Sequence, residues 1–279
     1  MACPSAPRSR LSWRTEGRYP YGTLEPFLGH GARTTLASMR AQAVARQSVR
    51  TADLMAPLSA ALDAAIGIPS GHALRTSLLA MRLAEALGIG DRDRSALFYA
   101  ALLHEAGSQP TAEGRERIAT RRLVVLSRGS EDERRAEEHA RARRGARIAL
   151  QAGFGPEVAV TIMALHEHWD GKGLPIGLAG PAIPLFARLV AVCHDLERLI
   201  QQRGAQHAEE AIHARAGSWY DPELVGVLLA LCSTGLLPEL SDEDLADRVA
   251  DLEPSWLERR SDAGDEMRIR GALGSGNPL

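Results

Sequence analysis

The sequence is poor in cysteine and lysine and contains no long apolar run. Its three cysteines, Cys3, Cys193 and Cys232, are an odd number without CxxC spacing, which argues against a disulfide framework or a zinc ribbon. No window approaches the roughly 18 apolar residues of a membrane span, and no apolar stretch follows the N-terminal arginines to complete a signal peptide. We therefore expect a protein of the reducing cytoplasm with no membrane anchor.

The chain also lacks a strong charge of either sign. Its 33 basic and 35 acidic residues leave a net charge of -2, and Lys172 is the sole lysine. This balance creates no field that would draw the protein to nucleic acid or to an anionic membrane, so we expect neither as a partner. The arginines of residues 1–50 keep DNA binding as a third hypothesis, which salt-dependent binding lost on deleting that segment would support.

What is present is apolar content at helical spacing. The 279 residues are 45% hydrophobic, enough for a substantial core, and no run of β-branched residues alternates with polar ones. We predict an all-α fold with almost no sheet. Three parts are expected: an irregular, Arg-rich leader with one helix over residues 1–50, a helical domain over 51–238, and a short helix with a flexible tail over 239–279.

Capping residues and prolines predict where the helices of the central domain begin and end. Ser70 caps one that Gly88 stops, and Asp91 caps the next, which ends at Gly107. Pro156, Pro184 and Pro222 each suit a first helical turn. The predicted helices span residues 70–87, 91–107, 131–151, 156–168, 184–202 and 221–232.

Four separated segments carry a histidine at or near a helix end. They are Gly71-His72, His104-Glu105, His166-Glu167-His168 and His194-Asp195. Imidazoles and carboxylates from facing helices are what a helical bundle uses to hold a divalent metal, which can activate water against a phosphodiester. Any one of these histidines is more often an ordinary surface or hydrogen-bonded residue, so only the four together indicate a metal site.

The stretch HEHWDGKGLPIGLAGPAIPL (166–185) resembles the signature of the HD-GYP domain family. Four further segments resemble that family in the same order: HALRTSLLAMRLAEALGI (72–89), ALLHEAG (101–107), ARLVAVCHDLERL (187–199) and YDPELVGVLL (220–229). The resemblance covers residues 55–235. It implies an HD-domain helical bundle of the HD-GYP type and a metal-dependent phosphodiesterase acting on a cyclic dinucleotide.

The resemblance also implies site residues. His72 matches the first metal ligand, while His104 and Glu105 match the pair predicted to bind metal and to carry catalysis, with glutamate in place of aspartate. His166 matches the second of two paired histidines, but Leu165 occupies the place of the first and cannot bind metal. Ser108 stands where the family has a phosphate-positioning lysine.

Two ligand positions stay open. Spacing to Gly145 places Arg141 where a histidine is expected, and His139, two residues earlier, is the alternative ligand. At the last position His194 stands in place of an aspartate and Asp195 follows it, about 100° away around the helix, so only one of the two can point inward. We favour His194.

Residues Lys172, Gly173 and Pro175 are the predicted substrate-binding set. They lie in a tight loop whose glycines let the backbone approach a phosphate, although Lys172 is as readily an exposed loop charge.

Two functions therefore compete. The first is a cyclic di-GMP phosphodiesterase of bacterial signalling, with iron or manganese favoured over zinc and one ion favoured over two or none. The second is a degenerate HD-GYP-like module that regulates or binds a nucleotide or a signalling protein after losing ligands. The replaced residues at 105, 108, 165 and 194 point to the second.

Overall fold

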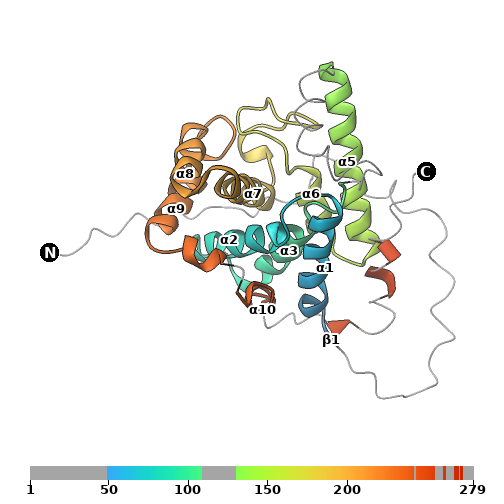
Figure 1. Cartoon of the computed structure of the whole chain (residues 1–279). Helices are drawn as coiled ribbons and strands as arrows, with labels where there is room; N and C mark the ends of the chain where they lie inside the picture. The colour runs from blue at the N-terminus through green and yellow to red at the C-terminus, as the bar shows by residue number, and fades with distance from the viewer. Residues whose placement is uncertain are drawn as a thin grey trace, which may run out of the picture. The chain divides into compact units, whose positions relative to one another are not determined.

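The computed structural model describes residues 49–108, 130–241, 243–254, 260–261, 267–269 and 271–272. These residues form a helical assembly within the unit Met39–Leu279 (Figure 1). The helices are α1 (Thr51–Ala65), α2 (His72–Ala86), α3 (Asp91–Leu103), α5 (Glu131–Gln151), α6 (Pro156–Met163), α7 (Leu185–Arg203), α8 (Ala205–Ala214), α9 (Pro222–Ser233) and α10 (Leu245–Ala250). Short 3-10 turns occur at η2 (Gly180–Ala182) and η3 (Leu237–Leu240). The prediction of an all-α fold is confirmed.

Two short strands pair at the edge of this assembly. β1 (Val49–Arg50) runs antiparallel to β2 (Arg260–Ser261), with Val49 opposite Ser261. Most of the leader helix predicted before residue 50 lies outside the described residues.

The predicted helix over 131–151 matches α5. Ser130 accepts a hydrogen bond from the backbone N–H of Glu133, whose side chain accepts one from the backbone N–H of Ser130. This reciprocal capping box satisfies two donors at the helix start. Its strong local signal explains why the sequence locates this helix well.

Other predicted ends need correction. Ser70 does not cap α2: Gly71, at φ 83°, precedes His72, and the carboxylate of Asp63 on α1 accepts from the Ala73 backbone N–H at 3.0 Å. A residue distant in sequence thus supplies the cap. α3 ends at Leu103 rather than Gly107, and α6 ends at Met163 rather than His168, because turns follow both. The prediction also missed α8.

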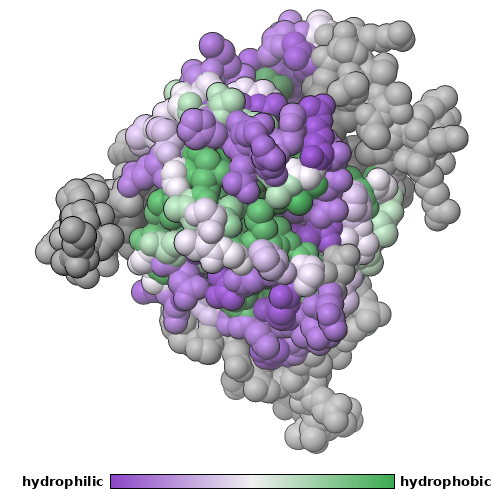
Figure 2. Space-filling view, turned by 60° about the vertical axis from the view of Figure 1, so that its left-hand side comes forward, coloured by the Kyte–Doolittle hydropathy of each residue, from purple (hydrophilic) through white to green (hydrophobic). Residues whose placement is uncertain are grey.

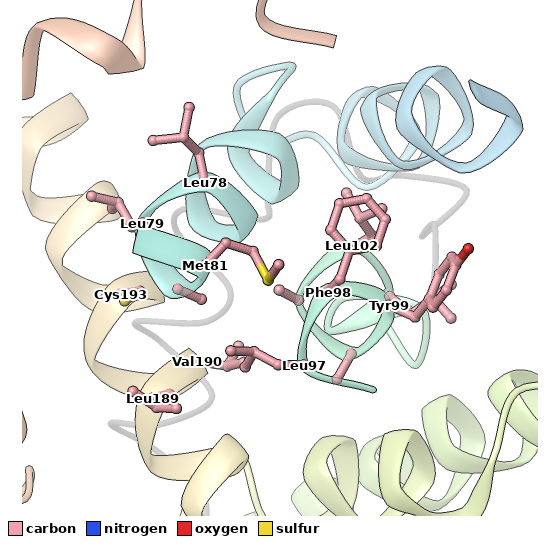
Figure 3. Close-up of a cluster of buried hydrophobic side chains, with 14 of the residues drawn as sticks. Leu78, Leu79, Met81, Leu97, Phe98, Tyr99, Leu102, Leu189, Val190 and Cys193 are labelled. Atoms are coloured by element: carbon pink, nitrogen blue, oxygen red, sulfur yellow. The ribbon is translucent and has the colours of Figure 1, made fainter. Parts of the chain in front are cut away.

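The core is centred on α2, which packs against α3 on one side and α7 on the other. Figure 3 shows the side chains that face one another there: Met81 from α2, Leu97 and Phe98 from α3, and Val190 from α7. A buried side chain of this size stabilises the fold by about 1.5–3 kcal/mol. This packing fixes the mutual rotation of the three helices that carry the histidines of the site.

The region after residue 239 contributes to the same core. α10 packs against α1 and α2, and the side chains of Val249 and Ile269 are buried. The hydroxyl of Tyr99 on α3 donates a hydrogen bond to Glu253. The boundary at residue 238 stays a prediction, but these contacts join part of the C-terminal segment to the helical domain.

On the face seen in Figure 2, apolar residues gather in the middle and hydrophilic residues lie above and below them. Among the described residues, α9 has the partly buried apolar side chains Val227, Leu229 and Leu231 packed on the core. Cys193 and Cys232 are buried free thiols. No helix in the described part of the chain is long and apolar enough to cross a membrane.

Candidate metal centre

Three buried imidazoles converge where α2, α3 and α7 meet. His72 is the first residue of α2, His104 directly follows α3, and His194 lies in the middle of α7. Their ring centroids are 5.0 to 5.2 Å apart, and the rings meet edge to face. The sequence separates these residues widely, so the helix packing described above brings them together.

Each imidazole is held through its Nδ1 atom. His72 Nδ1 bonds to a carboxylate oxygen of Glu197, His104 Nδ1 lies 2.6 Å from the Ala101 carbonyl oxygen, and His194 Nδ1 lies 3.0 Å from Asp195 Oδ1. Since a carbonyl oxygen only accepts, His104 Nδ1 must donate, and in the neutral ring Nε2 keeps its lone pair. The same argument applies to the other two rings, and the Nε2 atoms of His72 and His104 lie 3.2 Å apart.

Glu105 supplies a fourth donor. One ligand atom from each of His72, His104, Glu105 and His194 lies within 4.8 Å of all the others, and all four residues are buried. The two carboxylate oxygens of Glu105 have different partners: Oε1 lies 3.5 Å from His194 Nε2, whereas Oε2 accepts a hydrogen bond from Ser108 Oγ. We call these four residues the four-donor cluster.

The imidazoles of the cluster differ in the charge state that their surroundings favour. Burial lowers the pKa of His72 and, together with the neighbouring imidazoles, lowers that of His104 well below its usual value. Burial also opposes the charged form of His194, but its contacts with Asp195 and Glu105 outweigh that cost and raise its pKa. Neutral imidazole is the form that binds metal, so burial favours that form for His72 and His104, whereas an ion would have to displace the proton that these contacts favour on His194.

The donor set passes a test of fit to a divalent ion. His194 Nε2 is buried and makes no hydrogen bond within the described residues, although a buried polar atom normally has a partner. Three nitrogens and one carboxylate oxygen are a common ligand set for zinc, iron and manganese. An ion would satisfy the nitrogen that the protein leaves unbonded.

Sequence reasoning missed the residues that support the cluster. Glu197 lies three residues after His194 on α7, and its Oε1 accepts a hydrogen bond from Arg75 Nε at 2.6 Å. Arg75 itself lies three residues after His72 on α2. Both side chains are buried. The i,i+3 spacing to a predicted ligand was the signal that could have identified them, because it places two side chains on one helix face.

Three predicted ligands do not join the four-donor cluster. Asp195 accepts from His194 and, through Oδ2, from the Tyr220 hydroxyl at 2.6 Å, so it orients a ligand instead of being one. The half-buried ring of His166 has its centroid 6.1 Å from that of His194. His139 is half-buried on α5, where Arg141 rather than His139 reaches Glu105. The structure thus favours His194 over Asp195.

The predicted substrate-binding residues lie in the loop over residues 170–179, which a buried carboxylate organises. Glu167 accepts hydrogen bonds from the backbone N–H groups of Ile176, Gly177 and Leu178 at 2.8 to 2.9 Å. A Cβ on Gly173 would lie 2.1 Å from the backbone nitrogen of His168, so this glycine is needed for close packing.

The other two members of that set differ in exposure. Pro175 is buried after a cis peptide bond. The side chain of Lys172 is 83% exposed, and its Nζ lies 3.5 Å from Asp170 Oδ2. Substrate contact by Lys172, Gly173 and Pro175 stays a prediction.

A family model described as "HD domain" matches residues 34–224 of the chain, well over half of its length. The chain belongs to the HD domain family. The family predicted from the five sequence segments is therefore confirmed.

Several relatives of this chain have named activities. The chain is 28% identical over 251 residues to "3'3'-cGAMP-specific phosphodiesterase 3" of Vibrio cholerae, and the match covers 76% of this chain and 55% of the relative. It is 31% identical over 189 residues to a cyclic di-GMP phosphodiesterase response regulator of Xanthomonas campestris, covering 64% of this chain and 48% of the relative.

The fold also matches a solved structure. The crystal structure of a cyclic GMP-AMP specific phosphodiesterase of V. cholerae matches with a TM-score of 0.73 and 28% identity, covering 83% of this chain and 61% of that chain. The chain spans about half the length of the curated relatives it matches.

Proposed function

We propose that this HD domain is a metal-dependent phosphodiesterase that hydrolyses a cyclic dinucleotide. The observation that carries the proposal is the convergence of three imidazoles and the Glu105 carboxylate on one buried point. The named activities of the relatives support a cyclic dinucleotide as the substrate class. Within that class, cyclic di-GMP and 3′3′-cGAMP are the two candidates.

The four-donor cluster would hold one divalent ion, with iron or manganese favoured over zinc. Such an ion supplies Lewis-acid activation of water and of the phosphodiester. The chain's own residues prepare the site: Glu197 and the Ala101 carbonyl fix the rings of His72 and His104. Because these rings are held before an ion binds, little side-chain freedom is lost on binding.

A second function, the degenerate regulatory module, is favoured by one specific feature. Arg141 and Leu165 occupy places where the family resemblance expects histidine, and Leu165 is buried in the core. A module of this kind would bind a cyclic dinucleotide or a signalling protein without hydrolysing the nucleotide. It predicts ligand binding without turnover.

The test is turnover by the full-length protein loaded with Mn²⁺ or Fe²⁺. Cyclic di-GMP and 3′3′-cGAMP are incubated separately, and linear dinucleotide and mononucleotide products are quantified by chromatography and mass spectrometry. We expect a linear product from at least one substrate, and none after chelation. Bound metal with no product from either nucleotide would refute the phosphodiesterase, and tight nucleotide binding in the same sample would establish the regulatory module.

A further inference from the structure

Arg141 on α5 places a buried guanidinium directly beside the four-donor cluster. Its Nη1 lies 3.4 Å from both Glu105 Oε2 and Ser108 Oγ. Its Nε and Nη2 lie 3.1 and 3.0 Å from Glu138 Oε2 on the same helix. The side chain is only 13% exposed, and a buried cation of this kind needs such partners. Arg141 therefore joins two carboxylates, one of which belongs to the cluster.

The backbone holds position 141 at this place. A Cβ on Gly107 would lie 2.2 Å from the carbonyl oxygen of Arg141 and 2.9 Å from the backbone nitrogen of Gly145. The turn after α3 and the helix α5 thus approach more closely than any residue with a side chain at position 107 would allow. Arg144 Nε also donates to the Gly107 carbonyl oxygen at 3.1 Å. This close approach places the backbone of residue 141 beside the turn that contains Glu105, and the arginine side chain spans the remaining distance to the carboxylate.

The two oxygens of the Glu105 carboxylate have different contacts, and the guanidinium binds only one of them. Oε2 contacts Ser108 and Arg141, whereas Oε1 lies 3.5 Å from His194 Nε2 and faces the imidazoles. A second divalent ion on the Oε2 side would have to displace the guanidinium or lie against a like charge.

We propose that Arg141 is a positioning residue that orients Glu105 as a one-oxygen ligand and occupies, with its own charge, the place of a second cation, so that the chain binds a single divalent ion. This inference rests on the metal site of the proposed function. It assigns to Arg141 a role that its family-like position alone does not predict.

The test is metal stoichiometry in the full-length protein, stripped with chelator, reloaded with excess Mn²⁺, desalted and measured by elemental analysis and Mn²⁺ electron paramagnetic resonance. We expect one ion per chain in the wild type and in Arg141→Lys, which keeps the charge. We expect two in Arg141→His, which removes the charge and adds a nitrogen ligand, with spin coupling between the ions. Arg147→Gln, exposed on the same helix, is the matched control and should keep one ion.

Wild-type protein that binds two coupled ions would overturn the inference, whether or not Arg141→His folds. Arg141→His that melts as the wild type does and still binds one ion would also overturn it. Both results leave the proposed phosphodiesterase standing if a cyclic dinucleotide is hydrolysed. Absence of bound ion from the wild type would instead refute the metal site, and with it both proposals.

Discussion

One buried carboxylate supports the four-donor cluster and another supports the loop over residues 170–179, but the two accept hydrogen bonds from different kinds of donor. Glu197 fixes an imidazole side chain, His72, and is itself held by Arg75. Glu167 instead accepts three backbone N–H groups and so fixes the path of the loop. The loop carries the densest sequence match to the HD-GYP signature, whereas the cluster carries the chemistry. A segment with a dense motif match can therefore be one whose residues fix a backbone conformation, while the reacting groups lie elsewhere.

The largest effect should come from the cluster, and His104→Ala tests it. Removing one of four donors should cost metal affinity more than the 10- to 100-fold typical of losing an outer hydrogen-bond partner, and turnover should become undetectable. Metal titration and product analysis measure both. His139→Ala on α5 is the control and should keep metal and turnover. Equal losses in the two variants would mean that the cluster is wrongly placed.

Gly173→Ala tests the loop. The new Cβ would lie 2.1 Å from the His168 nitrogen and 2.6 Å from the Glu167 Cα, and backbone atoms cannot move aside cheaply. Overpacking of this kind should lower the free energy of unfolding by about 3 kcal/mol, measured by denaturant titration. Gly90→Ala, where a Cβ meets nothing within 4 Å, should change it by less than about 0.5 kcal/mol. Metal content of the folded fraction should be unchanged.

Glu197→Gln weakens the support of the cluster while keeping its shape. Loss of the charge removes the strong acceptor for His72 Nδ1 and the ionic partner of Arg75. Metal affinity should fall by about 10- to 100-fold, the range found when such partners of a ligating histidine are removed. Glu210→Gln, exposed on α8, serves as the comparison. If both variants bind metal as the wild type does, Glu197 has only a packing role.

Asp63→Asn separates the cap of α2 from the metal chemistry. Burial raises the pKa of Asp63 from 3.8 to about 7, against the hydrogen bond from Ala73. The folded state therefore holds a proton that the unfolded state has lost, so stability falls as pH rises from about 4 to about 7 and is then level.

In metal-free protein the asparagine variant should escape this fall and be more stable than the wild type by about 1–2 kcal/mol at pH 8. The rise of the Asp63 pKa from 3.8 to about 7 corresponds to about 4 kcal/mol, from which the cost of the weaker hydrogen bond to a neutral acceptor is subtracted. Thermal unfolding at pH 5 and pH 8 measures the difference, and exposed Asp132→Asn is the control. A variant equally destabilised at both pH values would contradict the assignment.

The smallest effect is expected for Lys172→Ala. Its side chain is largely exposed and paired only loosely with Asp170, so stability should change by less than about 0.5 kcal/mol and metal content should stay the same. A rise in KM for the cyclic dinucleotide at constant kcat would support the predicted substrate contact. A loss of metal in this variant would mean that the loop contributes to metal binding, contrary to the separate roles assigned to the loop and the cluster.

Local signals in the sequence determined the helical class and most of the helices. The capping box at Ser130 and the prolines at 156, 184 and 222 act within one turn of the chain, so they can be read directly from it. The family resemblance also pointed to His72, His104, Glu105 and His194. Each of them lies in a short segment whose residue spacing matches that of the family. The prediction missed α8. It also missed the cap of α2, because that cap depends on Asp63 from another helix.

Only the tertiary structure decided which of these side chains meet. Whether His194 or Asp195 faces inward depends on the rotation of α7, which its packing on α2 sets. The approach of Arg141 to Glu105 depends on the contact between Gly107 and α5, which lie far apart in the sequence. A sequence specifies the spacing along each helix, but the angle and rotation of one helix against another follow from how many side chains interdigitate at once. That is why the sequence offered seven candidate ligands, of which four converge in the fold, and why the contact between Arg141 and Glu105 became evident only in the folded chain.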